Sequence, residues 1–226
     1  MRVIDLTMPI RPHWRWDVAV ERLCTSGPSQ PFQISEIRTN VHAFTHVDSP
    51  LHAVAGGPSL DRIPVERLAG QAAVIDVSFK GPREAITASD LEAGAAHLQE
   101  GDIALLRTCW DTRYSFDSRE YWTQACHLTE DAVEWLYERR PSAVGYDFPQ
   151  DRPLQTLGRH ADTHFSGVLR LEDFPTHHLL LARGVLNIEY LVNLHRIRVE
   201  RPYLFALPIL VEGAEAAPAR VVAVEF

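Results

Sequence analysis

The chain has 226 residues, of which 46% are hydrophobic and 23% charged, values that fit a folded globular protein with a sizeable core. Its formal net charge of -8 argues against the basic face of a nucleic-acid-binding protein. No apolar stretch approaches the roughly 20 residues of a membrane span. The three cysteines lie far apart and predict neither a disulfide framework nor a CxxC metal site. We expect a cytoplasmic protein with one domain over residues 1–226.

Short β-branched runs alternate with capped helical segments, which is the pattern of a mixed α/β domain. The charged, strand-like start at residues 1–5 does not resemble a signal peptide. We expect strands in the following ranges: 73–77, 103–106, 143–146, 185–188, 203–211 and 219–226.

Two helices are predicted between these strands. Thr87 and Asp90 have the spacing of an N-terminal cap, and helix-forming residues follow over 91–98. Thr129 opens a second helix, which Pro141 ends. The alternation of these helices with the strands predicts flanking helices on a mixed sheet.

Residues 8–32 and 148–176 are less regular and rich in proline, histidine, arginine and aromatic residues. Long loops inside a compact domain are often functional. Trp14, Trp16 and Phe32 are therefore candidates for a pocket wall, with a cover for the core edge or a subunit contact as the alternative.

The segment from His42 to His52 is the most informative part of the chain, because it holds three histidines and an aspartate. Imidazole and carboxylate groups are the usual nitrogen and oxygen ligands of zinc and its neighbours. In a straight strand His42 and His46 would lie ~13 Å apart, too far for one metal ion. If they share a metal, the backbone coils here, as Asp48 and Pro50 permit. The alternative is a set of hydrogen-bonded histidines on a surface loop.

Further ligands are needed elsewhere, and His177 and Glu189 are the best candidates. Asp48 and Glu189 could each bridge two metals through their two oxygens. The alternative makes His177 a helix-end histidine and Glu189 a solvated carboxylate.

A rival set lies in the second irregular segment. His160 and His164 are four residues apart with Asp162 between them, so on a helix both histidines would share one face. This set is either a metal site or part of a solvated loop over the pocket.

At these residues the sequence resembles the cyclase family that contains bacterial kynurenine formamidase and isatin hydrolase. The family pattern H-x-G-T-H-x-D-x-P-x-H is matched at His42, Thr45, His46, Asp48, Pro50 and His52. Phe44 stands where the pattern has glycine. A second pattern, H-x2-L-L followed by E-x-L-x-N-L, is matched at His177, Leu180, Leu181, Glu189, Leu191, Asn193 and Leu194. Similarity extends through most of the chain.

The resemblance implies a swivelling β/β/α-type fold, a homodimer or homotetramer, and one or two zinc or manganese ions per subunit. It implies these ligands for a first metal: His42, His46, Asp48 and Glu189. It implies these for a second: Asp48, His177 and Glu189. His52 matches the general acid/base, and Trp14 or Trp16 matches the aromatic position that touches substrate. Phe44 predicts a pocket of altered shape, because glycine permits backbone angles that a larger residue resists.

The resulting hypothesis is an arylformamidase-like hydrolase of a small amide. A metal-activated water attacks the substrate carbonyl, and His52 carries the proton to the leaving nitrogen. One alternative keeps the site but opens a lactam or lactone, or performs a cyclisation or dehydration. The other alternative is a non-catalytic module that binds a metal or a small ligand.

Overall fold

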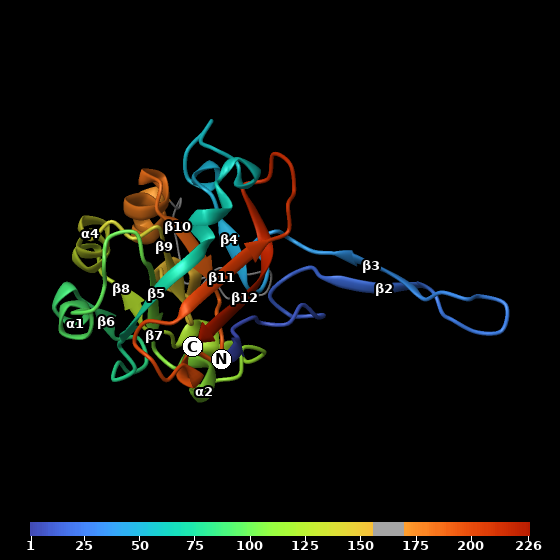
Figure 1. The fold of residues 1–226 in the computed structure, drawn as a ribbon, viewed down its shortest axis with the longest axis horizontal. Helices are drawn as coiled ribbons and strands as arrows, with labels where there is room; N and C mark the ends of the chain where they lie inside the picture. Colours follow the sequence, from blue (N-terminus) through green and yellow to red (C-terminus); the bar gives the residue numbers. More distant parts are fainter. Residues whose placement is uncertain (156–169) are drawn as a thin grey trace.

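The computed structural model describes residues 1–155 and 170–226, and its centre is a mixed sheet that closes on itself (Figure 1). Its eight described strands are β1 (Arg2–Asp5), β4 (His46–Asp48), β5 (Ala69–Asp76), β7 (Ile103–Arg107), β9 (Ala143–Tyr146), β10 (Leu186–Glu189), β11 (Tyr203–Pro208) and β12 (Ala216–Glu225). Their order is β1-β12-β11-β5-β7-β9-β10-β4, and β12 pairs with β4 as well. This extra pairing gives the sheet a barrel-like form.

Helices and smaller pairings surround this sheet (Figure 1). The α-helices are α1 (Ala88–Gly94), α2 (Trp110–Arg113), α3 (Arg119–Thr123) and α4 (Glu130–Glu138). The smaller pairings join β2 (Ala19–Cys24) to β3 (Ile34–Arg38) and β6 (Ala85–Ile86) to β8 (His127–Leu128). Short 3-10 helices span Pro50–His52, Leu60–Arg62, Val65–Leu68, Arg152–Gln155, Leu171–Asp173, Leu181–Arg183 and Leu194–Arg196, and a π-helical turn spans Thr176–Leu180.

Strands β5, β7, β9 and β10 are parallel and bury both faces. In β7, Leu105 belongs to a core cluster formed by residues of all eight strands, whereas Leu106 packs in a second cluster with Leu91 of α1 and Leu136 of α4. Successive side chains of a strand point to opposite faces, so a strand between two cores is apolar throughout. This explains the unbroken hydrophobic runs in the sequence.

Gly145 shows how tightly these strands pack. A Cβ atom at this position would lie 2.8 Å from Leu105 Cδ2 and 2.9 Å from Leu191 Cδ1. Glycine in a strand interior often marks such a close approach. The small residue in β9 is therefore a packing requirement.

The predicted α/β class, a mixed sheet with flanking helices, is confirmed. Every predicted strand is present, with its ends shifted by a few residues at most positions. Thr87 caps α1 with Asp90 in a reciprocal capping box, as predicted, although α1 ends at Gly94 instead of Leu98. Thr129 is the N-cap of α4.

The expectation of irregular structure over residues 8–32 was wrong in part. Residues 19–24 form β2, which pairs antiparallel with β3 in a hairpin that projects from the body (Figure 1). All five residues of β3 are exposed. Because this hairpin buries no face against the core, its sequence lacks the alternation that reveals strands elsewhere.

Within the described residues, no helix is long and apolar enough to cross a membrane. The three cysteines, Cys24, Cys109 and Cys126, are free in the structure. The cytoplasmic location and the single-domain organisation stay predictions.

Candidate metal centre

Strand pairing brings the two halves of the candidate site together. The short strand β4 carries His46 and Asp48 and pairs antiparallel with β10, where Glu189 lies directly opposite His46. His42 precedes β4 in a turn, and His52 follows it in a 3-10 helix that begins at Pro50. The backbone therefore coils on both sides of a short strand, as a shared site for these histidines requires.

Phe44 adopts the backbone conformation that the family glycine would favour. Its φ angle is 61°, and its side chain is fully buried. The Phe44 ring lies 4.6 Å from the ring of Trp16 and 5.7 Å from that of His13, measured between centroids. A left-handed conformation costs a residue with a Cβ atom roughly 1–2 kcal/mol. Aromatic packing offsets this strain.

Nitrogen and oxygen atoms of five predicted ligands converge around Asp48. Asp48 Oδ1 lies 3.0 Å from His42 Nδ1 and 3.2 Å from His46 Nε2. Glu189 Oε2 lies 3.7 Å from His46 Nε2, and Glu189 Oε1 lies 3.5 Å from His177 Nε2. His177 Nε2 is also 3.8 Å from Asp48 Oδ2. The structure thus joins two sequence segments that are far apart in the chain.

Several of these atoms are buried without a hydrogen-bond partner, namely His46 Nε2 and both carboxylate oxygens of Asp48. Buried polar atoms in native proteins are normally satisfied, so such a group points to a bound ion or water. Two sets of mutually close ligand atoms share Asp48: His42, Asp48 and His52 form one, and His46, Asp48 and Glu189 the other. The residues present fit a metal ion, and the donors suit a borderline or hard cation.

The charges at the centre are strongly coupled. Burial raises the pKa of Glu189, and the negative charge of Asp48 raises it further. Burial would also raise the pKa of Asp48, but the imidazoles of His46 and His42 hold it well below its usual range. Burial opposes protonation of His177, yet Asp151, Glu189 and Asp48 raise its pKa to about 9. The carboxylates therefore favour positive charge at this position.

Supporting residues that the sequence analysis missed fix the ligands in place. Asp151 Oδ2 lies 2.7 Å from His177 Nδ1 and accepts a hydrogen bond of 2.6 Å from the Thr176 hydroxyl. The Gln150 amide donates to Glu189 Oε1. Such partners set the orientation of metal ligands. Asp151 could have been predicted as a site residue, because Asp147 and Asp151 are two acidic residues shortly after the strand at 143–146. Nothing in the sequence singled out Gln150.

Two further contacts orient the histidines of the first segment. His46 Nδ1 lies 2.8 Å from the Phe44 carbonyl oxygen, and His42 Nε2 lies 3.2 Å from Glu215 Oε1. In each case one ring nitrogen has a partner while the other faces Asp48. Glu215 was not predicted, because it precedes β12 and reaches the site only through the pairing of β12 with β4.

His52 lies beside the ligands, at the cavity. Its ring centroid is 4.1 Å from that of His42 and 5.4 Å from that of His177. Partial burial lowers the pKa of His52 to about 4; Asp48 opposes this shift and the neighbouring histidines add to it. His52 is therefore neutral near pH 7.

A cavity of about 330 Å³ opens onto this centre, and these residues line it: Arg15, Trp16, Asn40, His42, Asp48, His52, Leu154, His177, Glu189 and Tyr190. Of the predicted substrate-contacting residues, only Trp16 is in this wall. Phe44 is buried behind Trp16. The Trp14 indole donates to the Asp117 carbonyl oxygen at 2.7 Å, and Phe32 is exposed on the β2–β3 hairpin.

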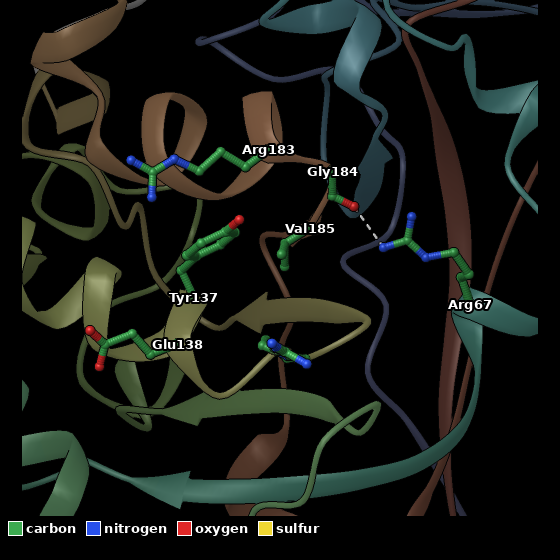
Figure 2. A pocket seen from close by; sticks show the side chains of 8 residues that line it. Arg67, Tyr137, Glu138, Arg183, Gly184 and Val185 are labelled. Atoms are coloured by element: carbon green, nitrogen blue, oxygen red, sulfur yellow. Dashed lines mark hydrogen bonds between the residues drawn. The ribbon is translucent and has the colours of Figure 1, made fainter.

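A second hollow, of about 550 Å³, lies between Arg67, Arg183 and the end of α4 (Figure 2). Arg67 donates to the carbonyl oxygens of Ser142 at 2.8 Å and Gly184 at 2.6 Å. Arg183 pairs with Glu134 at 2.9 Å. Arg140, which also lines the hollow, pairs with Glu100 at 3.3 Å. Among the described residues, each arginine of this hollow therefore already has a carboxylate or carbonyl partner.

The rival set of His160, Asp162 and His164 lies outside the described residues.

Comparison with known proteins agrees with the resemblance found in the motifs. The model of the putative cyclase family matches residues 4–150. Kynurenine formamidase of Salinibacter ruber is 28% identical over 230 residues, covering 98% of this chain and 97% of the relative. Kynurenine formamidase of Bacillus cereus is 25% identical, covering 97% of this chain and 95% of the relative. Both similarities extend over nearly the full length.

Solved structures show the same fold. A potential metal-dependent hydrolase with cyclase activity has a TM-score of 0.72 at 27% identity, covering 98% of this chain and 96% of that chain. Isatin hydrolase A from Ralstonia solanacearum has a TM-score of 0.79 at 24% identity, and the match covers 99% of this chain and 92% of that chain. The latter likeness establishes the fold alone.

Proposed function

Since this chain belongs to the cyclase family, we propose that it is a metal-dependent hydrolase that cleaves the C–N bond of a small amide, in the manner of an arylformamidase. The observation that carries the proposal is the set of buried, unpartnered ligand atoms on His46 and Asp48 at the end of a cavity. The full-length similarity to kynurenine formamidases supports an amide as the substrate.

We propose zinc or manganese as the metal, in one or two sites. His42, His46, Asp48 and Glu189 would hold one ion, and His177 would join Asp48 and Glu189 around a second. A bound ion of this kind lowers the pKa of a water molecule towards 7 and polarises a carbonyl group. Asp151 orients His177, and Gln150 orients Glu189.

His52 is the proposed proton carrier. It borders the cavity, its ring is neutral near pH 7, and its side chain is adjacent to the ligand set. In this role it accepts a proton from the attacking water and delivers it to the leaving nitrogen, because an amide nitrogen leaves readily only once protonated. Trp16 and Tyr190 shape the cavity and exclude water from the reacting group.

Elemental analysis paired with a hydrolysis assay tests this function. Wild-type protein should carry near-stoichiometric zinc or manganese and hydrolyse an aryl formamide, whereas His46→Ala should lose both. His195→Ala is the matched control, since His195 lies outside the site beside Asp111. A wild type that binds no metal after supplementation would refute the proposal. Metal without turnover of any amide, lactam or lactone would favour a binding module, and activity on lactams or lactones alone would favour ring opening.

We also propose that the chain assembles with copies of itself as a homodimer or homotetramer. The projecting hairpin exposes apolar side chains, with Val20 at 47%, Leu23 at 58% and Ile37 at 58% of their surface. An isolated two-stranded hairpin is marginally stable in water, so a partner surface would support it. Light scattering should give a multiple of the chain mass, reduced in Ile37→Glu; a monomeric wild type would refute this.

A further inference from the structure

Strand β11 presents an apolar face to solvent. Its residues alternate between exposed and buried, as in any strand with one face on a core. The buried side chains of Leu204 and Ala206 belong to the core cluster inside the closed sheet. The opposite side chains, Tyr203, Phe205 and Leu207, keep 43%, 37% and 44% of their surface exposed. A solvated face of an antiparallel sheet normally carries polar residues, so this face departs from the usual pattern.

The neighbouring strands extend this apolar surface, because residues directly opposite each other in paired strands point to the same side. Strand β12 places Val224 beside Tyr203, and β1 places Val3 beside Val224. The Phe226 ring packs 5.6 Å from the Tyr203 ring, measured between centroids. We call this surface the sheet face; its exposed apolar residues are Val3, Tyr203, Phe205, Leu207 and Phe226, together with residues 209–211 beyond the end of β11.

The α-helices protect a different part of the sheet. The buried residues of α1, α2, α3 and α4 belong to a separate core cluster, to which β1, β11 and β12 contribute no residue. Figure 1 shows α1 and α4 at the opposite side of the body from β12. The sheet face therefore lies outside the layer of helices.

The extent of the sheet face matches one half of a protein interface. Its three aromatic residues expose roughly 300 Å², at ~150–250 Å² for a whole aromatic side chain. The aliphatic residues add roughly 250 Å², at ~60–120 Å² for each whole side chain. A standard interface takes about 800 Å² from each partner, and about 65% of a homodimer interface is apolar. Contiguous apolar patches of this size mark interaction sites.

The charges on the sheet face make it complementary to itself. Arg220 lies beside Leu207, and Asp5 lies beside Val222. Arg220 Nη2 and Asp5 Oδ2 are 2.7 Å apart, and both side chains are exposed. An isologous interface brings the same patch of two copies together, so the cation of one copy can meet the anion of the other. The chain as a whole carries a net charge of -8, whereas this pair is balanced and allows two copies to approach.

We propose that the sheet face binds the same face of a second copy of this chain through a two-fold interface. Two sheets pack face to face at a separation of ~10 Å, with apolar side chains interdigitated between them. This interface is separate from the β2–β3 hairpin, which projects from the body (Figure 1), and it does not depend on the proposed hydrolase activity. Two different two-fold interfaces on one chain produce a homotetramer, so the hairpin and the sheet face together would assemble four copies.

The test measures the mass of the assembly by analytical ultracentrifugation over a range of concentrations. Phe205→Glu places a carboxylate at the centre of the sheet face. We expect the dissociation constant of this interface to rise about 30-fold or more, the effect of altering a central interface residue. Leu207→Glu should act in the same direction, because Leu207 is two residues further along the same face.

Phe79→Glu is the matched control. Phe79 is also exposed, at 62%, but it follows the end of β5 that lies away from the residues paired with β11. This variant should assemble as wild type does. Thermal unfolding identifies any variant that fails to fold.

A combination with Ile37→Glu separates the sheet face from the hairpin. In a wild-type tetramer, Phe205→Glu should leave dimers held by the hairpin, Ile37→Glu should leave dimers held by the sheet face, and the combined variant should be monomeric. If Phe205→Glu alone acts, the sheet face is the interface and the hairpin proposal fails. The sheet-face proposal is overturned by a monomeric wild type or by equal dissociation of Phe79→Glu. It is also overturned if Phe205→Glu and Leu207→Glu fold and assemble as wild type does.

Discussion

The closed sheet and the segment around the β2–β3 hairpin contribute to the same site in different ways. Strands β4 and β10 carry His46, Asp48 and Glu189, all nearly inaccessible to solvent. The other wall comes from the two ends of the hairpin, where Trp16 precedes β2 and Asn40 follows β3. The sheet thus holds the chemical groups rigidly, while the hairpin segment determines the shape of the cavity. Changes in the sheet should affect chemistry, and changes in the segment should affect selectivity.

The largest effect is expected from Asp48→Asn, which alters the residue at the centre of the ligand set. The amide retains the volume but loses the negative charge, and its nitrogen cannot bind a cation. We expect metal content to fall below one tenth and activity to fall by about 1,000-fold or more, since the metal supplies several kcal/mol of stabilisation. Elemental analysis and kcat/KM measure both.

The fold should survive this change, because asparagine keeps the volume of the side chain. Thermal unfolding without added metal should show a loss of stability, because His46 and His42 lower the pKa of Asp48 and the folded state therefore stabilises its negative charge. A protein that unfolds on this substitution would show that Asp48 is a structural residue of the sheet.

His52→Ala tests the boundary between the sheet and its loops, because His52 lies just beyond β4. We expect kcat to fall by about 100-fold or more, the usual contribution of a general acid/base. Metal content should stay near that of wild type if proton transfer is the main role of His52. Loss of metal would instead assign His52 to the ligand set with His42 and Asp48, which its position also permits.

The sequence predicts the residues carried by the closed sheet better than those carried by the irregular segments. His42, His46, Asp48 and Glu189 belong to motifs, and the hydrophobic runs of β7 and β9 reflect burial on both faces. Arg15 and Gln150 belong to no motif, since each reaches the site only when a long irregular segment folds back on the sheet. The β2–β3 hairpin was missed because its side chains contact solvent instead of the core. Local patterns thus predict what burial and motif spacing determine, and little else.

Phe44→Gly tests whether the hairpin side of the site sets selectivity. The substitution relieves the strain at φ 61° but removes a fully buried ring that packs on Trp16. Large-to-small changes of this kind cost about 3–5 kcal/mol, and relief of roughly 1–2 kcal/mol opposes the loss. A net destabilisation of about 2 kcal/mol should appear in urea unfolding.

The freed space should lower KM for aryl formamides with larger rings relative to formanilide. Phe44→Leu is the control, because it retains the strain and much of the volume and should leave the relative KM values nearly unchanged. If Phe44→Gly shifts no substrate preference, Phe44 is a packing residue alone, and the cavity shape depends on Trp16.

The smallest effect is expected at Asp147, a buried carboxylate that the proposed chemistry does not use, and it concerns the pH dependence of stability. Asp147 follows β9 and accepts hydrogen bonds from the Thr108 hydroxyl at 2.6 Å and from the backbone N–H groups of Thr108 and Cys109. Burial outweighs these donors and raises the pKa of Asp147 to about 7 from 3.8. Between these values the folded protein holds a proton that the unfolded chain releases. The contribution of Asp147 to stability therefore falls as pH rises towards 7.

Thr108→Val should consequently cost more stability at pH 8.5 than at pH 5. Above pH 7 the hydroxyl stabilises an ionised carboxylate, and a hydrogen bond to a charged group contributes about 1.5–3 kcal/mol; to a neutral one it contributes about 0.5–1.5 kcal/mol. Urea unfolding at the two pH values should therefore differ by about 1 kcal/mol. Thr129→Val is the control: it removes a hydroxyl that donates to the Ile86 carbonyl oxygen, and the loss of stability should be the same at both pH values. An equal loss for Thr108→Val at the two pH values would mean that Asp147 does not change its protonation state in this range.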